Sequence, residues 1–350
     1  MVEAETVGLK PKRICVIKAR AIGDVVMTTP SLRSLRAAFP DAHITMFVRE
    51  FCADVVRHLP YLDNIFVYEK AGNHGGLAGR LRLIRELRSR KFDLVVNFHD
   101  DFQTVLFAFL SGAEIRLGFK NKWDFLLTHK LTCPEELHIV DRHLALLELI
   151  GVRGSNRKLE LVLTEADRSA ARRFLQGHGL LGRKLVGMVA GSQWQKKRWP
   201  AESFAQVNDV LAEFGVAVIL IGSPSEVPYL RSIAALTKFL PTIAAGETSL
   251  IVSAALLEHC NVVLTNDTGP MHIAGALGRP IVALFGPTDP EKARPPQAPS
   301  IVLWKGRICD KCTGTICQEL TCLRGIGVAE VIDALTRYLD VEEDNVTIEN

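Results

Sequence analysis

The sequence has no apolar run that approaches the roughly 18 residues needed for a membrane-spanning helix. Its longest candidates, such as residues 144–152, are about half that length, and this one contains Glu148. Residues 1–13 lack the apolar core of a secretory signal. These absences predict a cytoplasmic protein, and they limit any contact with a membrane to a peripheral one.

A strong excess of one charge is also missing. The chain carries 42 lysines and arginines against 39 aspartates and glutamates, a net charge of +3. Because no RNA-binding signature or zinc-finger spacing accompanies this weak charge, nucleic acid is not an expected partner. Neither half contains GxGxxG after its first predicted strand, and the P-loop pattern GxxxxGK followed by Ser or Thr is absent. These absences argue against nicotinamide dehydrogenases and P-loop NTPases.

The length and composition predict two globular domains, with 350 residues of which 48% are hydrophobic and 23% charged. Predicted strands and helices alternate in two series, which is typical of doubly wound α/β domains with parallel sheets. The two series meet around residues 163–184. We expect one domain over residues 1–164, a second over 165–326, then a helix over 327–340 and a disordered acidic tail over 341–350.

Short β-branched or apolar runs mark the predicted strands. In the first half they lie at residues 13–18, 43–48 and 93–98, and in the second half at residues 185–191, 216–222 and 262–264. Helical patterns separate them, among others near residues 202–214 and 248–260. Pro30 interrupts the first helical pattern, so we expect a kink or a restart of the helix there.

Polar residues that suit an anion follow the last of these strands. The turn contains Asp267, Thr268 and Gly269, and a helix follows with Pro270 and His272 in its first turn. Unpaired N–H groups and the positive end of the helix dipole would point at this turn. The residues alone leave two interpretations open, a phosphate site or a helix merely capped by Asp267 or Thr268.

Four further positions stand beside predicted strand ends. Gly23 and Asp24 form a strand-to-helix turn, where Asp24 suits either a catalytic base or an N-cap. Ser192 follows a strand and offers its hydroxyl to a phosphate. The triplet at residues 196–198 is by itself more typical of a solvated basic turn. Glu226 is by itself typical of an exposed glutamate that begins a helix.

Three segments carry a resemblance to a known family. RICVIKARAIGDVVMTTPSLRSL (residues 13–35), GSQWQKKRWP (191–200) and NDTGPMHIAGALGRPIVALFGPTDP (266–290) resemble the lipopolysaccharide heptosyltransferases of glycosyltransferase family 9, closer to the type II enzymes. The motifs occur in the family's order, and the resemblance covers roughly residues 12–335. It implies a glycosyltransferase-B architecture, with two facing Rossmann-like domains and a cleft between them. It also implies that the helix over 327–340 packs back on the first domain.

The resemblance further implies a reaction. The enzyme would move heptose, with inversion, from ADP-heptose bound mainly by the second domain to a Kdo- or heptosyl-bearing lipid A core bound by the first. Such an enzyme would work peripherally on the cytoplasmic face of the inner membrane and require no divalent metal. Alternatives are another nucleotide sugar and surface glycan, a sugar-nucleotide epimerase, or a non-catalytic nucleotide-sugar-binding protein.

Matching the family's motifs residue by residue assigns roles to single positions. Asp24 matches the family's aspartate and would be the base, while Lys197 matches the lysine that neutralises the leaving phosphate. Some members carry a threonine pair where this chain has Gly191-Ser192-Gln193. The nucleotide-sugar site would comprise Gly23, Ser192, Lys197, Glu226, Asp267, Thr268, Gly269 and His272.

Eight cysteines fall into two groups. The isolated ones, Cys15, Cys52, Cys133 and Cys260, are expected to be reduced core thiols. The clustered ones either bind a structural zinc ion or form free thiols or oxidation disulfides, because their spacing differs from the two tight pairs of usual zinc sites. A similar segment occurs in type II heptosyltransferases. These candidates are Cys309, Cys312, Cys317 and Cys322.

Arginines and leucines interleave in residues 80–91 as on an amphipathic helix. Most such segments are solvated faces, and the alternative is contact with a membrane or with an anionic acceptor.

Overall fold

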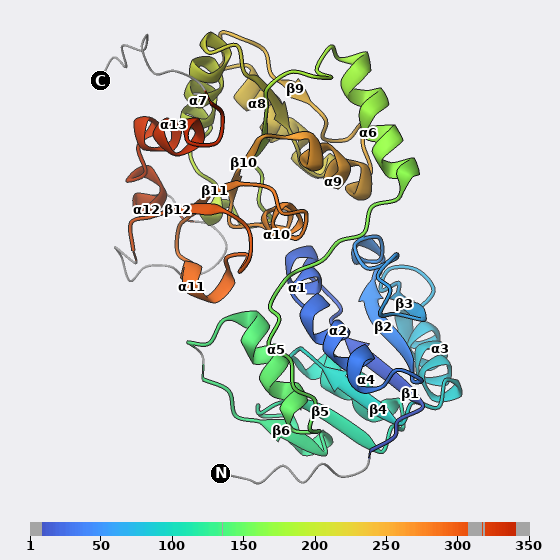
Figure 1. Ribbon diagram of the computed structural model, residues 1–350. Coiled ribbons are helices and arrows are strands. Elements are labelled where there is room, and N and C mark those ends of the chain that lie inside the picture. Colours follow the sequence, from blue (N-terminus) through green and yellow to red (C-terminus); the bar gives the residue numbers. More distant parts are fainter. Residues whose placement is uncertain (1–8, 135, 307–316, 318, 341–350) are drawn as a thin grey trace. The chain divides into compact units, whose positions relative to one another are not determined.

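The computed structural model describes residues 9–134, 136–306, 317 and 319–340. The chain divides into two compact units, Met1–Val162 and Leu163–Asn350 (Figure 1). The division lies two residues before the predicted one, inside the segment where the two series of strands were expected to meet.

The first unit contains a parallel sheet with the strand order β3-β2-β1-β4-β5-β6. Its strands are β1 (Arg13–Ile17), β2 (His43–Arg49), β3 (Asn64–Tyr68), β4 (Leu94–Asn97), β5 (Ile115–Phe119) and β6 (His129–Leu131). Its α-helices are α1 (Ile22–Val26), α2 (Thr29–Ala38), α3 (Gly76–Ser89), α4 (Phe102–Leu110) and α5 (Ile139–Glu148), and short 3-10 turns lie at Glu50–Cys52 and Asp124–Leu126. The predicted restart at Pro30 is confirmed, because α1 ends and α2 begins with Pro30 in its first turn.

The second unit contains a parallel sheet with the order β12-β11-β10-β7-β8-β9. Its strands are β7 (Leu185–Val189), β8 (Ala217–Leu220), β9 (Thr242–Ile243), β10 (Val262–Asn266), β11 (Ile281–Phe285) and β12 (Ser300–Trp304). Its helices are α6 (Glu165–Gly177), α7 (Ala201–Glu213), α8 (Val227–Ala234), α9 (Leu250–His259), α10 (Gly269–Ala276), α11 (Pro290–Ala293), α12 (Thr321–Arg324) and α13 (Val328–Thr336), with 3-10 turns at Gln195–Lys197 and Pro224–Glu226.

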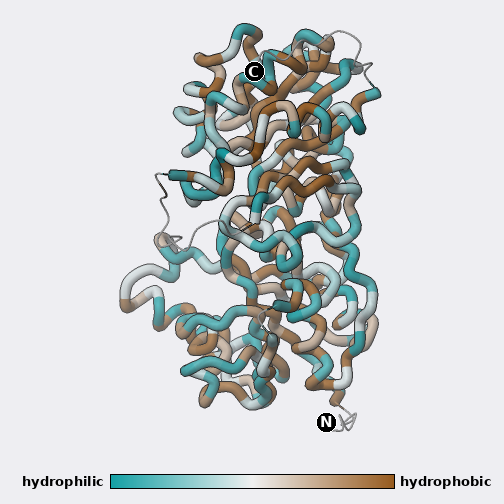
Figure 2. Tube along the Cα trace, turned by 90° about the vertical axis from the view of Figure 1, so that its left-hand side faces the viewer, coloured by the Kyte–Doolittle hydropathy of each residue, from teal (hydrophilic) through white to brown (hydrophobic). Residues whose placement is uncertain are grey.

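Both sheets have the same doubly wound order, read from opposite ends. The chain reverses its direction of winding between β1 and β4 in the first unit and between β7 and β10 in the second. Open α/β sheets bind ligands at the carboxyl ends of the strands beside such a reversal. The central strands are buried on both faces, and Figure 2 shows apolar segments running through the interior of each unit. The topology therefore singles out the loops after β1, β4, β7 and β10.

The C-terminal helix belongs to the second unit. Val331 and Leu335 on α13 are fully buried in the core of that unit, where α13 packs against α7 and β11. The indole N–H of Trp199 also donates to the carbonyl of Ile326, 3.1 Å away, just before the helix. This helix thus packs within the second unit, and its implied packing on the first domain stays a prediction. Its apolar stripe predicts burial, but the stripe does not specify which core receives it.

Within the described parts of the chain, no helix combines the length and apolar character needed to cross a membrane. The predicted disordered tail, residues 341–350, lies outside the described residues.

Candidate functional site

Asp24 lies beside a buried lysine that the sequence analysis did not single out. Lys18 follows β1, and its ammonium lies 3.3 Å from the Asp24 carboxylate while donating to the carbonyl of Phe98 at 3.2 Å. The side chain of Lys18 is 8% exposed, whereas that of Asp24 is 35% exposed. The lysine is therefore fixed in the fold, and the carboxylate remains accessible at the carboxyl end of the sheet.

The turn that presents Asp24 is strained at Ala21. This residue precedes α1 with a φ of 64°, a region that residues with a Cβ rarely occupy. Gly23, predicted to form the tip of the turn, instead lies buried within α1, where its carbonyl accepts from the amide of Met27. The sharp change of direction between strand and helix is therefore made by Ala21.

A neutral histidine completes this edge of the first sheet. His99 follows β4, and its Nε2 accepts a hydrogen bond of 2.9 Å from the backbone N–H of Ala19. An imidazole nitrogen that accepts carries no proton. Burial, assisted by the charge of Lys18, lowers the pKa of His99 to about 3 although the carboxylate of Asp101 opposes this. The loops after β1 and β4 are thus joined by a histidine that is uncharged at neutral pH.

We expect His99→Gln to reduce the pH dependence of unfolding. The pKa of this histidine is about 3 when folded and near 6.5 when unfolded, so below pH 6.5 only the unfolded chain takes up its proton. Stability is then present in full above pH 6.5 and lost as the pH falls, by up to about 1.4 kcal/mol for each pH unit. Glutamine can accept the Ala19 N–H without titrating.

Urea unfolding near pH 7 and near pH 5 measures this difference. The free energy of unfolding should fall by about 2 kcal/mol less in the variant than in the wild type over that interval. Buried His143, whose pKa burial also lowers, is present in both proteins and cancels in the comparison. Equal losses in the two proteins would show that His99 takes up its proton in the folded state.

In the second unit, Asn266 fixes the loop that carries Lys197. This fully buried residue ends β10, and its side-chain amide donates to the carbonyl of Ala190 at 2.7 Å while its oxygen accepts from the amide of Trp199 at 3.1 Å. Both partners belong to the loop after β7. One side chain therefore ties together the two loops beside the reversal of the second sheet.

Lys197 is engaged rather than solvated. Its ammonium donates to the Asp267 carboxylate at 2.5 Å and lies 5.2 Å from the centre of the Trp194 ring. The neighbouring Arg198 donates twice to the carbonyl of Ser192, at 2.9 and 2.7 Å. The basic triplet is therefore held by contacts at the carboxyl edge of the second sheet. An ammonium has three N–H donors, so Lys197 can bind Asp267 and still reach an anion.

The start of α10 has no side-chain cap. Thr268 is its N-cap residue in an extended conformation and makes no side-chain capping bond, and Asp267 is directed to Lys197 instead. Pro270 occupies the first turn as predicted, and His272 is buried on the helix. The structure therefore contradicts the interpretation in which Asp267 or Thr268 caps this helix. The amides and dipole at this helix start suit an anion.

Glu226 and Gly191 meet at the ends of β7 and β8. The carboxylate accepts from the amide and hydroxyl of Ser223 at 2.7 and 2.8 Å, in a capping box. A Cβ on Gly191 would lie 2.1 Å from Glu226 Oε1, so only glycine leaves room for the carboxylate. Ser192, the next residue, is buried and its hydroxyl accepts from the amide of Trp194.

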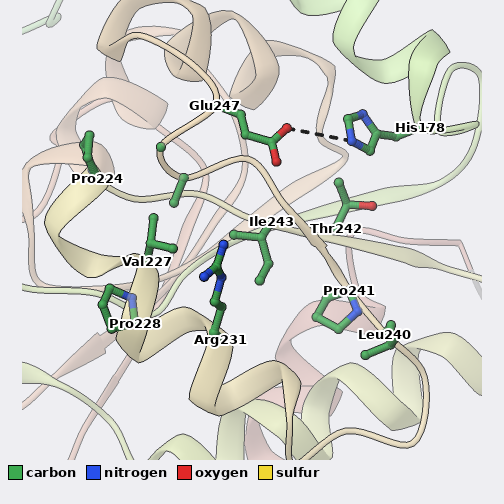
Figure 3. Close-up of a pocket in the computed structure, with 12 residues that line it drawn as sticks. His178, Pro224, Val227, Pro228, Arg231, Leu240, Pro241, Thr242, Ile243 and Glu247 are labelled. Carbon is green, nitrogen blue, oxygen red and sulfur yellow. Dashed lines mark ion pairs between the residues drawn. The ribbon is translucent and has the colours of Figure 1, made fainter.

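A cavity of about 830 Å³ lies at the β9 edge of the second unit. Figure 3 shows Arg231 extending between Pro228 and Ile243, and His178 paired with Glu247 at 4.0 Å. None of the predicted site residues lines this cavity.

The cysteines give no metal site in the part of the chain that the structure describes. Cys309 and Cys312 lie outside the described residues, and Cys317 and Cys322 form no disulfide within the described part of the chain. The isolated cysteines are free thiols as predicted, but the predicted core position is wrong for Cys133, which is only half-buried. Burial raises the pKa of three of them to about 12, which keeps them as thiols: Cys15, Cys52 and Cys260.

Comparisons with known proteins bear on this arrangement. The sequence model of glycosyltransferase family 9 (heptosyltransferase) matches residues 80–322. This chain belongs to glycosyltransferase family 9. The resemblance seen in the sequence is thereby confirmed, and the activity of the family is glycosyl transfer.

Individual relatives agree with the family. The structure of a family 9 glycosyl transferase from Veillonella parvula DSM 2008 is 33% identical, with a TM-score of 0.83 and coverage of 95% of this chain and 98% of that one. The ADP-heptose lipopolysaccharide heptosyltransferase II of E. coli is 25% identical, with a TM-score of 0.77 and coverage of 93% and 98%. The lipopolysaccharide core heptosyltransferase OpsX of Haemophilus influenzae is 27% identical over 81% of this chain and 82% of its own. The predicted glycosyltransferase-B fold is confirmed.

Three residues that build these edges were not predicted as site residues: Lys18, His99 and Asn266. Lys18 ends a predicted apolar strand, His99 directly follows one, and Asn266 lies two residues after one. A polar side chain at the carboxyl end of a buried parallel strand was the available signal.

Proposed function

We propose that this protein transfers heptose from ADP-heptose to the Kdo- or heptosyl-bearing inner core of lipopolysaccharide, with inversion at the transferred carbon. The names of the relatives, an ADP-heptose heptosyltransferase and a lipopolysaccharide core heptosyltransferase, support this donor and this kind of acceptor. The observation that carries the proposal is the Lys197–Asp267 pair beside the uncapped start of α10. This pairing of a cation with helix amides suits a departing diphosphate.

Asp24 is the proposed base. Its carboxylate is accessible and held by Lys18, and it takes the proton of the acceptor hydroxyl as the oxygen attacks the anomeric carbon. The bond to the diphosphate breaks on the opposite side of that carbon, which inverts its configuration. Ala21 shapes the turn that presents this carboxylate, and His99 holds the preceding loop through the Ala19 amide. Because His99 is uncharged near neutral pH, it adds no titrating group there.

The second unit is proposed to hold the donor. The Lys197 ammonium and the amides at Thr268 and Gly269 take up the charge of the leaving ADP, and His272 lies in the same helix turn. Glu226 is the proposed partner of the ribose hydroxyls, with one oxygen held by Ser223 and the other over Gly191. Gly23 and Ser192 contribute backbone and hydroxyl contacts. This set supplies positive charge without a divalent metal.

The decisive experiment measures ADP release from ADP-heptose with Kdo-lipid A, with heptosyl-Kdo-lipid A and without acceptor. We expect release only with one of the core acceptors, and a product whose anomeric configuration by NMR is opposite to that of the donor. Parallel reactions use UDP- and GDP-sugars. Acceptor-dependent release from one of these instead would reject the heptose donor, and turnover of nucleotide sugar without any acceptor would reject the transferase.

A further inference from the structure

Helix α3 has one face fixed in the core of its unit and an opposite face that is exposed. Leu83 and Leu87 are each 1% exposed and pack beneath the helix, where Gly79 lies so close to the His74 backbone that a Cβ would be 2.5 Å from it. On the opposite side, Leu77 is 77% and Leu81 is 49% exposed. The two outward leucines therefore contribute little to the core of this unit.

Arginines surround these leucines. Because residues three or four positions apart stack on one side of a helix, Leu77, Leu81, Arg85 and Arg88 share the outward face, and Arg80 flanks it. None of the arginines of α3 forms an ion pair with a described carboxylate. The face is thus basic and unneutralised.

The single acid of α3 does not neutralise this face. Glu86 pairs with His74 at 3.2 Å, and His74 is buried beside the inner side of the helix. Two arginines use part of their guanidinium groups on backbone carbonyls, Arg82 on Asn73 and Arg88 on Leu110. Arg80 and Arg85 extend from the helix into solvent.

We propose that the outward face of α3 binds the surface of an anionic lipid bilayer. Arginines would contact the headgroups while Leu77 and Leu81 enter the boundary between headgroups and acyl chains. A nucleic acid would complement the positive charge of the arginines but leave the leucines in water. A purely apolar partner would cover the leucines but leave the arginines without counter-charges. With only two leucines, attraction between charges dominates, so binding is reversible and weakened by salt. This property does not depend on the transferase reaction.

The test is co-flotation of the full-length protein with vesicles that contain no saccharide lipid. We expect binding to phosphatidylcholine vesicles mixed with phosphatidylglycerol, little binding to phosphatidylcholine alone, and release by salt. The double variant Arg80→Glu/Arg85→Glu should bind the anionic vesicles at least roughly 30-fold more weakly. Because neither side chain has an ion pair or hydrogen bond among the described residues, thermal unfolding of the variant should match that of the wild type.

The matched control is Arg173→Glu/Arg183→Glu, which makes the same change in net charge at two exposed arginines of the second unit. It should retain most of the binding. Equal losses in both double variants would mean that net charge alone acts, and the α3 surface would be rejected. Wild-type protein that binds anionic and neutral vesicles alike, or only vesicles carrying the saccharide acceptor, would also overturn the proposal.

Tryptophan fluorescence tests whether the outward leucines enter the bilayer. Leu77→Trp should show a blue shift of its emission on anionic vesicles relative to the wild-type background. An unchanged spectrum, together with self-association of the chain, would identify α3 as a protein interface instead.

Discussion

Asp24→Asn is expected to lower kcat for sugar transfer by about 10²- to 10⁴-fold, the range of a positioned base. Asparagine keeps the size of the side chain and can still accept from the Lys18 ammonium, but it cannot take the proton of an attacking hydroxyl. Apart from Gly23, the proposed donor residues lie in the other unit of the chain, so the affinity for ADP should remain near that of the wild type. Steady-state kinetics and calorimetric titration with ADP separate the two quantities.

Asp101 provides the matched control. It lies at the same edge of the first sheet, pairs with Arg20 at 3.2 Å, and caps α4 by accepting from the amide of Thr104. Asparagine is as good an N-cap as aspartate, so Asp101→Asn preserves the helix start. We expect less than about a tenfold change in kcat for it. If the two variants lose activity equally, the role of Asp24 as the base is wrong. The loss of activity would then come from the lower negative charge at this edge of the first sheet.

The doubly wound fold was predictable because its signal is local. Runs such as residues 216–222 are apolar throughout, as strands buried on both faces must be, and helical periodicity separates them. The turn before α10 was also visible, since Gly269 and Pro270 mark a helix start within a few residues of its strand. These features need no knowledge of distant parts of the chain.

The remaining parts of the site depend on contacts between distant residues. Lys18 approaches Phe98 and Ala19 approaches His99 across 80 positions of sequence, because β1 and β4 are neighbours only in the folded sheet. The left-handed conformation of Ala21 was hidden, since a glycine two residues later offered the more obvious turn. The core that receives α13 was hidden too, since its apolar stripe would fit either unit.

Lys197→Met is expected to reduce both catalysis and stability. Loss of the ammonium should lower kcat by about 10²- to 10³-fold, as for one preorganised donor to a developing anion, and weaken ADP binding. It also leaves the Asp267 carboxylate, which is only 7% exposed, without its partner. Removing one member of such a pair costs about 3 kcal/mol in the free energy of unfolding. Enzyme kinetics and urea unfolding measure the two effects.

The double variant Lys197→Met/Asp267→Asn separates these effects. An uncharged amide in place of the stranded carboxylate removes the buried charge, so most of the lost stability should return. Activity should stay low, because neither methionine nor asparagine supplies positive charge to the leaving diphosphate. Recovery of kcat along with stability would mean that Lys197 only neutralises Asp267. Stability that returns while kcat and ADP affinity do not would assign the ammonium to the departing phosphate, with Asp267 as the residue that positions it.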